Sequence, residues 1–214
     1  MEKYLMIDTE TANGLDDPFY YDLGLAVVDE VGQIYETASF INADIFLDED
    51  MMNTAYYREK MPHYWDGIKN GERTLAKHAT IRKAVREIMA KYDIKYVVAH
   101  NARFDYRSTN YTQRLLTSSK YRYFFPFGTV ILDTLKMARA TFKDDEPYIN
   151  FCKKNGFVTK RGLPQFTAEV LYRFITQDTE FIESHTGLED VLIEAKIFAY
   201  CRKRNPNEKG RLWE

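Results

Sequence analysis

The sequence predicts a mixed α/β domain in which helices pack against a sheet. Three stretches with strand character come first, at residues 4–7, 23–28 and 33–41. Short apolar runs then alternate with helical patterns, and the chain closes with helices. This order of elements is typical of a mixed sheet with helices on its faces.

Length and composition favour one independently folding domain. The 214 residues are enough to bury a core without disulfides or a structural metal. Apolar residues make up 45% and charged residues 29%, which excludes a disordered polymer, a collagen-like repeat and a coiled-coil rod. No repeat or linker rich in Gly, Ser or Pro divides the chain, so we expect a single domain over residues 1–214.

The same features bear on location. No window approaches eighteen consecutive apolar residues, so we expect no membrane span and no membrane partner. The N-terminal apolar run is interrupted almost at once by an acid, which argues against a signal peptide. Cys152 and Cys201 form no CxxC pair, and we expect two reduced, buried thiols in a cytoplasmic protein.

Each element follows from a local pattern. Residues 4–7 are a short apolar run typical of a buried strand. Two further strands are joined by a tight turn, and short runs at residues 96–99 and 129–132 bring the predicted sheet to five strands. Helical periodicity or helix-end signals predict helices at residues 81–92, from about 104, at 134–141, 147–154 and 165–175, and from 188 to about 204.

Charge is unevenly distributed although the net charge is only −2. Residues 14–50 hold ten acids and no Lys or Arg, whereas residues 103–143 hold eight bases against Asp105 and Asp133. A basic face of this kind fits a polyanionic partner, and solvated faces that segregate by chance fit equally well. Charge alone leaves both interpretations open.

Acids stand where two predicted buried strands end. Asp8 and Glu10 follow the first strand, and in an extended chain their side chains share one face with Cα atoms about 6.6 Å apart. Asp105 follows the strand at 96–99, at the edge where open α/β sheets bind ligands. Buried carboxylates at such positions indicate a bound cation, although the helix dipole alone also favours an acid at Asp105.

The third acidic segment is Ser184-His185-Thr186-Gly187-Leu188-Glu189-Asp190. Thr186 and Glu189 match the capping-box pattern, which predicts a helix with Thr186 as its N-cap. His185 and Asp190 then occupy two positions that usually hold packed apolar side chains, so we expect an imidazole beside a carboxylate. The plain alternative is a surface His–Asp contact of little energetic value.

Asp8, Glu10, Asp105 and Asp190 would repel one another unless cations balanced their charge. Two hard divalent ions fit this oxygen-rich set, one to activate a water and one to stabilise the leaving oxygen during in-line attack on phosphorus. His185 is placed to accept the proton of the water, since its unperturbed pKa is about 6.5. We expect activity to rise through neutral to mildly alkaline pH, delayed by the nearby acids.

In this order and spacing, the segments Asp8-Thr9-Glu10, His100-Asn101-Ala102-Arg103-Phe104-Asp105 and His185 followed five residues later by Asp190 resemble the DEDDh exonucleases of the ribonuclease H-like superfamily. The family includes the proofreading subunit of the bacterial replicase, ribonuclease T and oligoribonuclease. The resemblance extends over nearly the whole chain. It implies a ribonuclease H-like, five-stranded mixed sheet with three antiparallel strands, flanked by helices. It also implies two Mg²⁺ or Mn²⁺ ions and 3′→5′ release of nucleoside monophosphates, with Asp8, Glu10, Asp105 and Asp190 as metal ligands and His185 as general base.

The matching segments also supply candidates for contacts with substrate, namely Thr9, Thr11, His100, Asn101 and Phe104. Phe104 adjoins an active-site acid and is the best candidate for stacking on a base. The first motif departs from the family: it continues Thr-Ala-Asn-Gly after Glu10 where many members have Thr-Thr-Gly, so we expect a different contact with the terminal nucleotide. We interpret Asp133 as a helix-capping residue rather than a fifth ligand.

Two regions beyond the motifs carry expectations of their own. Residues 42–79 are longer than in compact members of the family, and we expect an insert of loop and short helices that covers the site or binds a partner. Residues 103–125 mix aromatic side chains with bases. Basic grooves with stacking rings bind single strands, although ordinary packing accounts for most such rings.

The sequence thus predicts a metal-dependent 3′→5′ exonuclease acting on single-stranded or frayed nucleic acid, with DNA favoured over RNA. Two alternatives stay open. One is a non-catalytic module that binds nucleic acid or protein on the same fold. The other is a proofreading subunit that contacts a polymerase through residues 42–79 or through Arg202–Arg204.

Overall fold

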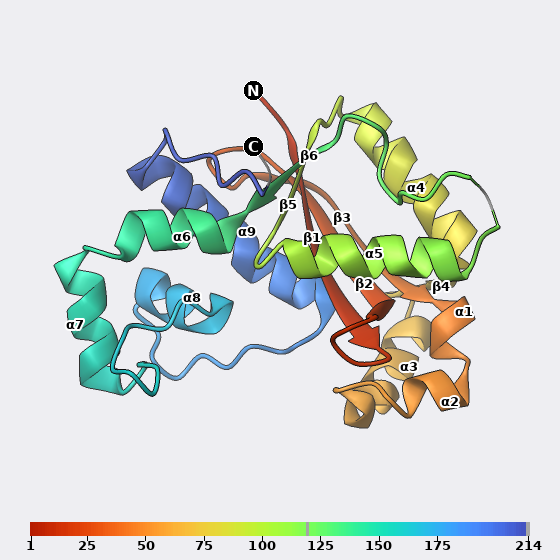
Figure 1. Ribbon diagram of the computed structural model, residues 1–214, viewed down its shortest axis with the longest axis horizontal. Helices are drawn as coiled ribbons and strands as arrows, with labels where there is room; N and C mark the ends of the chain where they lie inside the picture. Colours follow the sequence, from red (N-terminus) through yellow and green to blue (C-terminus); the bar gives the residue numbers. More distant parts are fainter. Residues whose placement is uncertain (119, 213–214) are drawn as a thin grey trace.

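A six-stranded sheet forms the centre of the computed structural model, which describes residues 1–118 and 120–212 (Figure 1). Its strands are β1 (Tyr4–Ala12), β2 (Phe19–Val28), β3 (Ile34–Asn42), β4 (Thr74–Ala76), β5 (Tyr96–Ala99) and β6 (Val130–Asp133). Their order is β4-β3-β2-β1-β5-β6. The first three strands run antiparallel, and the pairs β1–β5, β5–β6 and β3–β4 are parallel. The sheet is mixed as expected, with one strand more than the five predicted.

Helices connect and cover the strands. They are α1 (Ala43–Phe46), α2 (Glu49–Met52), the 3₁₀ helix η1 (Arg58–Lys60), α3 (Met61–Lys69), α4 (His78–Lys91), α5 (Arg103–Leu115), α6 (Thr134–Phe142), α7 (Glu146–Asn155), α8 (Ala168–Thr176) and α9 (Gly187–Arg204). Helix α8 begins at Ala168, three residues after the predicted start at residue 165, because Thr167 is its N-cap and accepts a hydrogen bond from Val170 N–H. Among the described residues no helix has both the length and the apolar character needed to cross a membrane.

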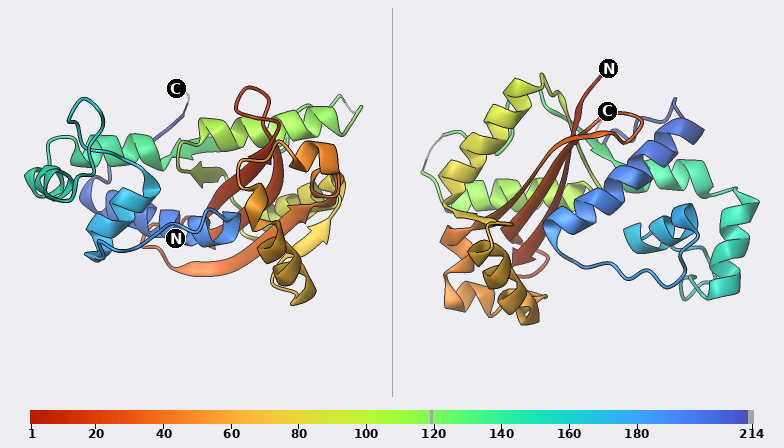
Figure 2. Two further views of the ribbon diagram at one scale, coloured as in Figure 1. Left: turned by 90° about the horizontal axis from the view of Figure 1, so that it is seen from below. Right: turned by 180° about the vertical axis from the view of Figure 1, so that it is seen from behind.

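Alternate residues of β1 enter two different cores. Tyr4 and Met6 pack with α6–α9, whereas Leu5 and Ile7 pack with α4 and the start of α5. Helix α9 accordingly lies on one face of the sheet and α5 on the other (Figures 1 and 2). Because side chains alternate along a strand, Asp8 and Glu10 should point to the same face as Tyr4 and Met6, which is the face covered by α9.

The region at residues 42–79 forms short helices joined by loops, as expected, together with the strand β4, which was not predicted. Its helices bury Phe46, Met52 and Tyr64 in a third core cluster, which also contains Tyr21 of β2. The strand β4 pairs with the edge of β3 and accounts for the extra strand of the sheet. With three residues, β4 is too short to show the two-residue period by which strands are recognised in a sequence.

Candidate active site

The first two acids lie inside β1 rather than beyond its end. The apolar run ends at Ile7, but β1 continues to Ala12, and Asp8 lies opposite Gly24 of β2. One carboxylate oxygen from each of Asp8, Glu10 and Asp190 lies within 4.8 Å of the other two. The structure therefore brings together three of the four predicted metal ligands.

Asp105, the fourth predicted ligand, is buried at the start of α5 beside this group. Its Oδ1 accepts hydrogen bonds from the N–H and the hydroxyl of Thr9, at 3.0 and 2.9 Å. Burial raises the pKa of Asp105 to about 7 in spite of these two bonds. Thr9, a predicted contact for substrate, is thus buried on the α5 face of β1, where it orients Asp105.

Two glycines set the position of α9 against the sheet. A Cβ atom on Gly24 would lie 2.0 Å from the carbonyl carbon of Gly187, so the first residue of α9 sits directly on β2. The N–H of Gly187 donates to Asp22 Oδ2 at 2.8 Å. Because Gly24 is the neighbour of Asp8 in β2, this contact brings Asp190 over the acids of β1.

The N-terminus of α9 confirms the predicted helix start and corrects the predicted cap. Thr186 is the N-cap residue, but its hydroxyl donates to Glu189 Oε2 at 2.7 Å instead of accepting from a backbone N–H. Glu189 is in turn paired with Arg73, with Nη2 and Oε1 2.8 Å apart. Arg73 Nη1 lies 3.6 Å from the buried carboxylate of Asp22. One arginine from the 42–79 region therefore bridges the two carboxylates that hold this helix end.

His185 lies in a strained backbone conformation above the cluster. Its φ is +50°, a left-handed value that is uncommon for a residue other than glycine. Its ring stacks on Tyr57 with centroids 4.7 Å apart and planes at 11°. Lys60 Nζ donates to the carbonyl oxygens of Ser184 and His185. The region at residues 42–79 thus holds residues 184–185 in place through Tyr57 and Lys60.

The pKa of His185 is lowered, whereas the sequence led us to expect that nearby acids would raise it and so delay the loss of the proton. Burial lowers it below the usual 6.5, and the neighbouring Lys60 lowers it further. The imidazole Nδ1 and one carboxylate oxygen of Glu183 are 3.9 Å apart. His185, Asp190 and Glu183 each offer a ligand atom within 4.8 Å of the others, so the expected pairing of imidazole and Asp190 carboxylate is present with a second acid beside it.

The carboxylates carry charge that the neighbouring cations do not balance. Burial raises the pKa of Glu10 to about 9, and the charges of Asp22 and Asp190 add to the rise. Burial and then Glu183 raise the pKa of Asp190 to about 8. Lys60 opposes both shifts without cancelling them. A set of oxygen donors with excess negative charge is what Mg²⁺ and Mn²⁺ prefer, so the donor set fits two such ions.

Sequence reasoning missed two further acids. Glu194 is fully buried one helical turn after Asp190, and its Oε2 accepts a hydrogen bond from His100 N–H at 3.1 Å. Burial raises its pKa, and the charge of Asp105 adds to the rise. Glu183 is half-buried with a pKa raised to about 7, mainly by burial. The spacing of four residues from Asp190 was the signal for Glu194, because side chains at i and i+4 share a helix face.

A cleft of about 680 Å³ opens over these acids. Of the predicted substrate contacts, His100 and Asn101 line it. His100 Nε2 is 2.8 Å from the carbonyl oxygen of Phe166, and Asn101 N–H donates to Asp133. Asp133 also caps α6 through Leu135 N–H, as predicted. Thr11 and Phe104 are half-buried and lie outside the residues that line the cleft, so their contacts with substrate stay predictions.

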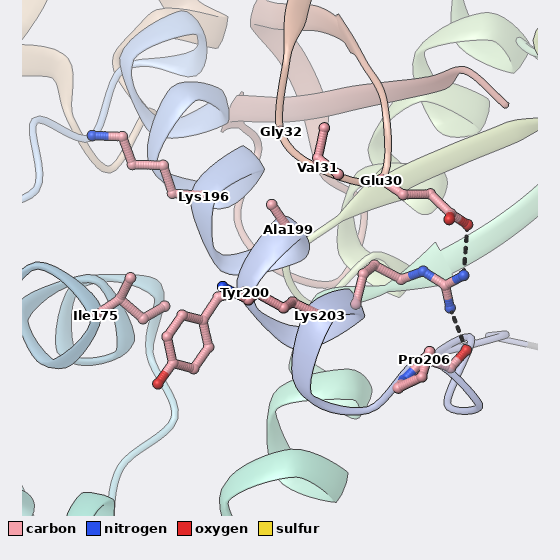
Figure 3. Close-up of a pocket in the computed structure, with 10 residues that line it drawn as sticks. Glu30, Val31, Gly32, Ile175, Lys196, Ala199, Tyr200, Lys203 and Pro206 are labelled. Atoms are coloured by element: carbon pink, nitrogen blue, oxygen red, sulfur yellow. Dashed lines mark hydrogen bonds and ion pairs between the residues drawn. The ribbon is translucent and has the colours of Figure 1, made fainter. Parts of the chain in front are cut away.

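A second hollow of about 680 Å³ lies at the other end of α9, against the turn between β2 and β3 (Figure 3). Here Arg202 pairs with Glu30, their nearest atoms 2.6 Å apart, and also donates to the carbonyl oxygen of Pro206. Val31 and Tyr200 contribute apolar surface. This hollow is lined by one acid, already paired, and by the bases Lys196, Arg202 and Lys203, so it lacks the excess of acids that marks the cleft.

The fold of this chain matches solved structures. No family model and no curated protein sequence matches this chain. Solved structures do match it, and they share the ribonuclease H-like architecture of a mixed sheet flanked by helices.

Several of the matching structures are of exonuclease I. E. coli exonuclease I in complex with a dT13 oligonucleotide is 16% identical with a TM-score of 0.56, over 96% of this chain and 42% of that one. Exonuclease I from Methylocaldum szegediense is 18% identical with a TM-score of 0.57, over 97% and 42%. A product-bound exonuclease I is 14% identical with a TM-score of 0.55, over 96% and 44%. The chain therefore corresponds to less than half of each of these proteins, and at these identities the likeness concerns the fold.

Proposed function

We propose that this protein is a metal-dependent 3′→5′ exonuclease that hydrolyses phosphodiester bonds of single-stranded or frayed nucleic acid to nucleoside monophosphates. The observation that carries the proposal is the convergence of Asp8, Glu10 and Asp190 on one point beside Asp105 and His185. Structures with the same fold contain single-stranded oligonucleotides, which favours DNA as substrate. Among the alternatives, a non-catalytic module would have no need of this set of acids and histidine.

Each catalytic group has a role that its surroundings support. Asp8, Glu10, Asp105 and Asp190 would hold two Mg²⁺ or Mn²⁺ ions, which supply charge stabilisation for phosphoryl transfer. His185 is neutral at pH 7 because burial and Lys60 lower its pKa, so it is able to accept a proton from the attacking water. With Nδ1 turned toward Glu183, Nε2 is the nitrogen left to accept it. His100 and Asn101 line the same cleft and are suited to contact the terminal nucleotide.

A 5′-labelled DNA strand incubated with the full chain and Mg²⁺ tests the proposal. We expect a ladder shortened from the 3′ end, no products with chelator, and a loss of about 1,000-fold in Asp8→Ala. Asp16→Ala is the matched control, because Asp16 is an exposed acid in the turn after β1. Full Mg²⁺-dependent activity in Asp8→Ala would show the assignment to be wrong. A matched RNA strand in the same assay determines which sugar is preferred.

The role of His185 has its own test. We expect His185→Ala to reduce the rate about 100-fold or more, and the acidic limb of the wild-type profile to lie below pH 6.5. Lys60→Met removes the nearby cation and should move that limb upward. A profile that is flat in the wild type and unchanged in His185→Ala would exclude the histidine as general base.

A polymerase partner stays a prediction. Of the C-terminal run expected to contact it, Arg202 is paired with Glu30 and Arg204 with Asp145 inside the chain. Residues 42–79, the other expected contact, pack against residues 184–185. These internal contacts assign both segments a role in the fold that requires no partner.

A further inference from the structure

Helix α5 presents its polar residues to the core and its aromatic and basic residues to the surface, which reverses the usual amphipathic pattern. The buried side consists of Asp105, Ser108, Thr109, Asn110, Thr112 and Gln113. The outer side lines a hollow of about 480 Å³ with Arg103, Tyr106, Arg107, Tyr111 and Arg114, and Asn110 of the buried side also borders this hollow. Two guanidinium groups, those of Arg107 and Arg114, lie 5.3 and 5.8 Å from the centre of the Tyr111 ring. Packing against the core does not account for the aromatic and basic side chains on the outer side of α5.

The loop after α5 extends this surface. A hollow of about 550 Å³ between α5 and residues 120–129 shares Tyr106 with the first one. Tyr123 is 57% exposed and Phe127 is fully exposed. Lys120 and Arg122 stand among these rings. Contiguous exposed rings on a folded domain mark an interaction site more often than chance.

The buried polar residues of α5 fix the backbone of this loop. Gln113 donates to the carbonyl oxygen of Tyr121 at 3.0 Å, and Asn110 accepts from Phe124 N–H at 2.9 Å. On the other side, Arg82 and Arg86 of α4 donate to carbonyl oxygens of residues 123–125. The exposed rings are therefore carried on a backbone that is already held in place, which reduces the entropic cost of binding a ligand.

Charge and position indicate the ligand. Residues 106–132 contain four Lys or Arg and no Asp or Glu, although the turn after β1 approaches Arg107 through the carbonyl oxygen of Asp16. Helix α5 begins at Arg103, two residues after Asn101, which lines the acidic cleft. Its 13 residues lead about 20 Å away from the cleft. The N-terminal end of α5 therefore adjoins the cleft, and the basic, ring-lined outer face of the helix leads from that end along the face of the sheet opposite α9.

We infer that the outer face of α5 and residues 120–129, together the α5 platform, bind the single-stranded nucleic acid that leads away from the 3′ end held in the cleft. The bases stack on exposed rings and the phosphates pair with Lys120, Arg122 and the arginines of α5. This inference rests on the proposed function. It adds the path of the strand outside the cleft and predicts that affinity depends on strand length.

Fluorescence anisotropy with 5′-labelled oligothymidylates of two, four, eight and twelve nucleotides tests the inference. The measurement is made in chelator, where no hydrolysis is expected. Affinity should rise with length in the wild type. The double variant Tyr123→Ala/Phe127→Ala should bind the longest strand about tenfold or more weakly, with binding of the dinucleotide unchanged. Tyr35→Ala, which removes an exposed ring of β3, is the control.

Salt dependence tests the basic part of the platform. Lys120→Ala/Arg122→Ala should reduce the slope of log affinity against log salt by about 0.7 for each phosphate that the variant no longer binds. Lys153→Ala/Lys154→Ala, which removes two bases of α7, should leave the slope unchanged. Affinity independent of length, or an equal loss in the platform and control variants, would overturn the inference.

The two proposals fail separately. Long strands that bind through the platform without being hydrolysed would contradict the nuclease and leave the platform standing. Hydrolysis that is lost in Asp8→Ala but indifferent to strand length and to the platform variants would contradict the platform alone.

Discussion

The two ends of α9 carry opposite charges. The cations at one end are paired with acids, whereas the acids at the other end lie close to further acids. At its N-terminus, Asp190 and Glu194 join other acids, and burial with mutual repulsion raises their pKa values. At its C-terminus, Arg202 and Arg204 are each paired with an acid from another part of the chain. Both arrangements suit the helix dipole, which favours acids at the first turn and cations at the last.

The difference lies in the partners that the fold supplies. Paired charges at the C-terminal end stabilise the position of the helix, whereas the acids at the other end cost stability until a cation arrives. An excess of acids with raised pKa values therefore distinguishes the candidate active site from the equally large hollow in Figure 3, which is lined by one acid and three bases.

Replacing one charged residue at each end of α9 should affect the rate of hydrolysis and the melting temperature differently. We expect Asp190→Asn to reduce hydrolysis about 1,000-fold, since it removes a predicted metal ligand, and to raise the melting temperature of the metal-free protein at pH 8, since it removes a repelled charge. Arg204→Met should leave the rate unchanged and lower the melting temperature slightly. Steady-state rates and thermal unfolding check both. Equal losses of activity at the two ends would remove the distinction between them.

Arg73 is the counter-charge at the N-terminal end, and its removal should be costly. Arg73→Met leaves Asp22 and Glu189 without their shared partner, one of them fully buried, so the free energy of unfolding should fall by about 3–5 kcal/mol. Lys69→Met breaks only the exposed pair with Asp66 and should cost less than about 0.5 kcal/mol. Urea denaturation measures both variants. A similar small loss in each would mean that Arg73 does not anchor the helix.

Without metal, stability should decrease as pH rises. The folded pKa values of Glu10 and Asp190 are raised to about 9 and 8 by burial and repulsion, so the unfolded chain releases their protons first. The contribution of these groups is complete below pH 4 and is lost as pH rises toward 8 and 9, by about 2 kcal/mol or more between pH 5 and 8. Saturating Mg²⁺ or Mn²⁺ should flatten this slope in denaturant titrations, and a metal-free stability that does not fall would contradict the account.

Glu30 at the other end is the matched control for that slope. Its pKa is lowered by hydrogen bonds from Tyr4 and Arg202, so its contribution is present above pH 4.5 and is lost as pH falls through the lowered value. Glu30→Gln should therefore leave the slope between pH 5 and 8 unchanged.

Local patterns were enough to predict most of the sheet and six residues that line the cleft, namely Asp8, Glu10, His100, Asn101, His185 and Asp190. Apolar runs located β1, β5 and β6, and the acids that follow them were chemically out of place in buried strands. The spacing of Asp8 and Glu10 was sufficient to predict that their side chains lie on the same face of the sheet, because side chains of a strand alternate with a period of two residues. The five catalytic candidates were singled out because each follows an apolar run or stands at a predicted helix start, although Asp8 and Glu10 lie inside β1.

The features of the site that the sequence did not predict depend on contacts between segments that are distant in the sequence. No local pattern shows that Arg73 reaches Asp22 and Glu189, or that Tyr57 stacks on His185. The shift of the His185 pKa was predicted in the wrong direction because its causes, burial first and then Lys60 of residues 42–79, depend on a tertiary arrangement that the sequence does not reveal. Glu194 was overlooked because its helix face otherwise carries core residues.

The contact between Gly24 and Gly187 has a consequence for how the protein tolerates change. Each position has room for a hydrogen atom and not for a methyl group, since a Cβ on Gly187 would also lie 2.6 Å from Gly24 N. An alanine at either position would push the helix outward and carry Asp190 with it. A shift of about 1 Å is enough to slow a reaction about 100-fold, so an alanine at either glycine should abolish the proposed hydrolysis while every carboxylate remains in the sequence.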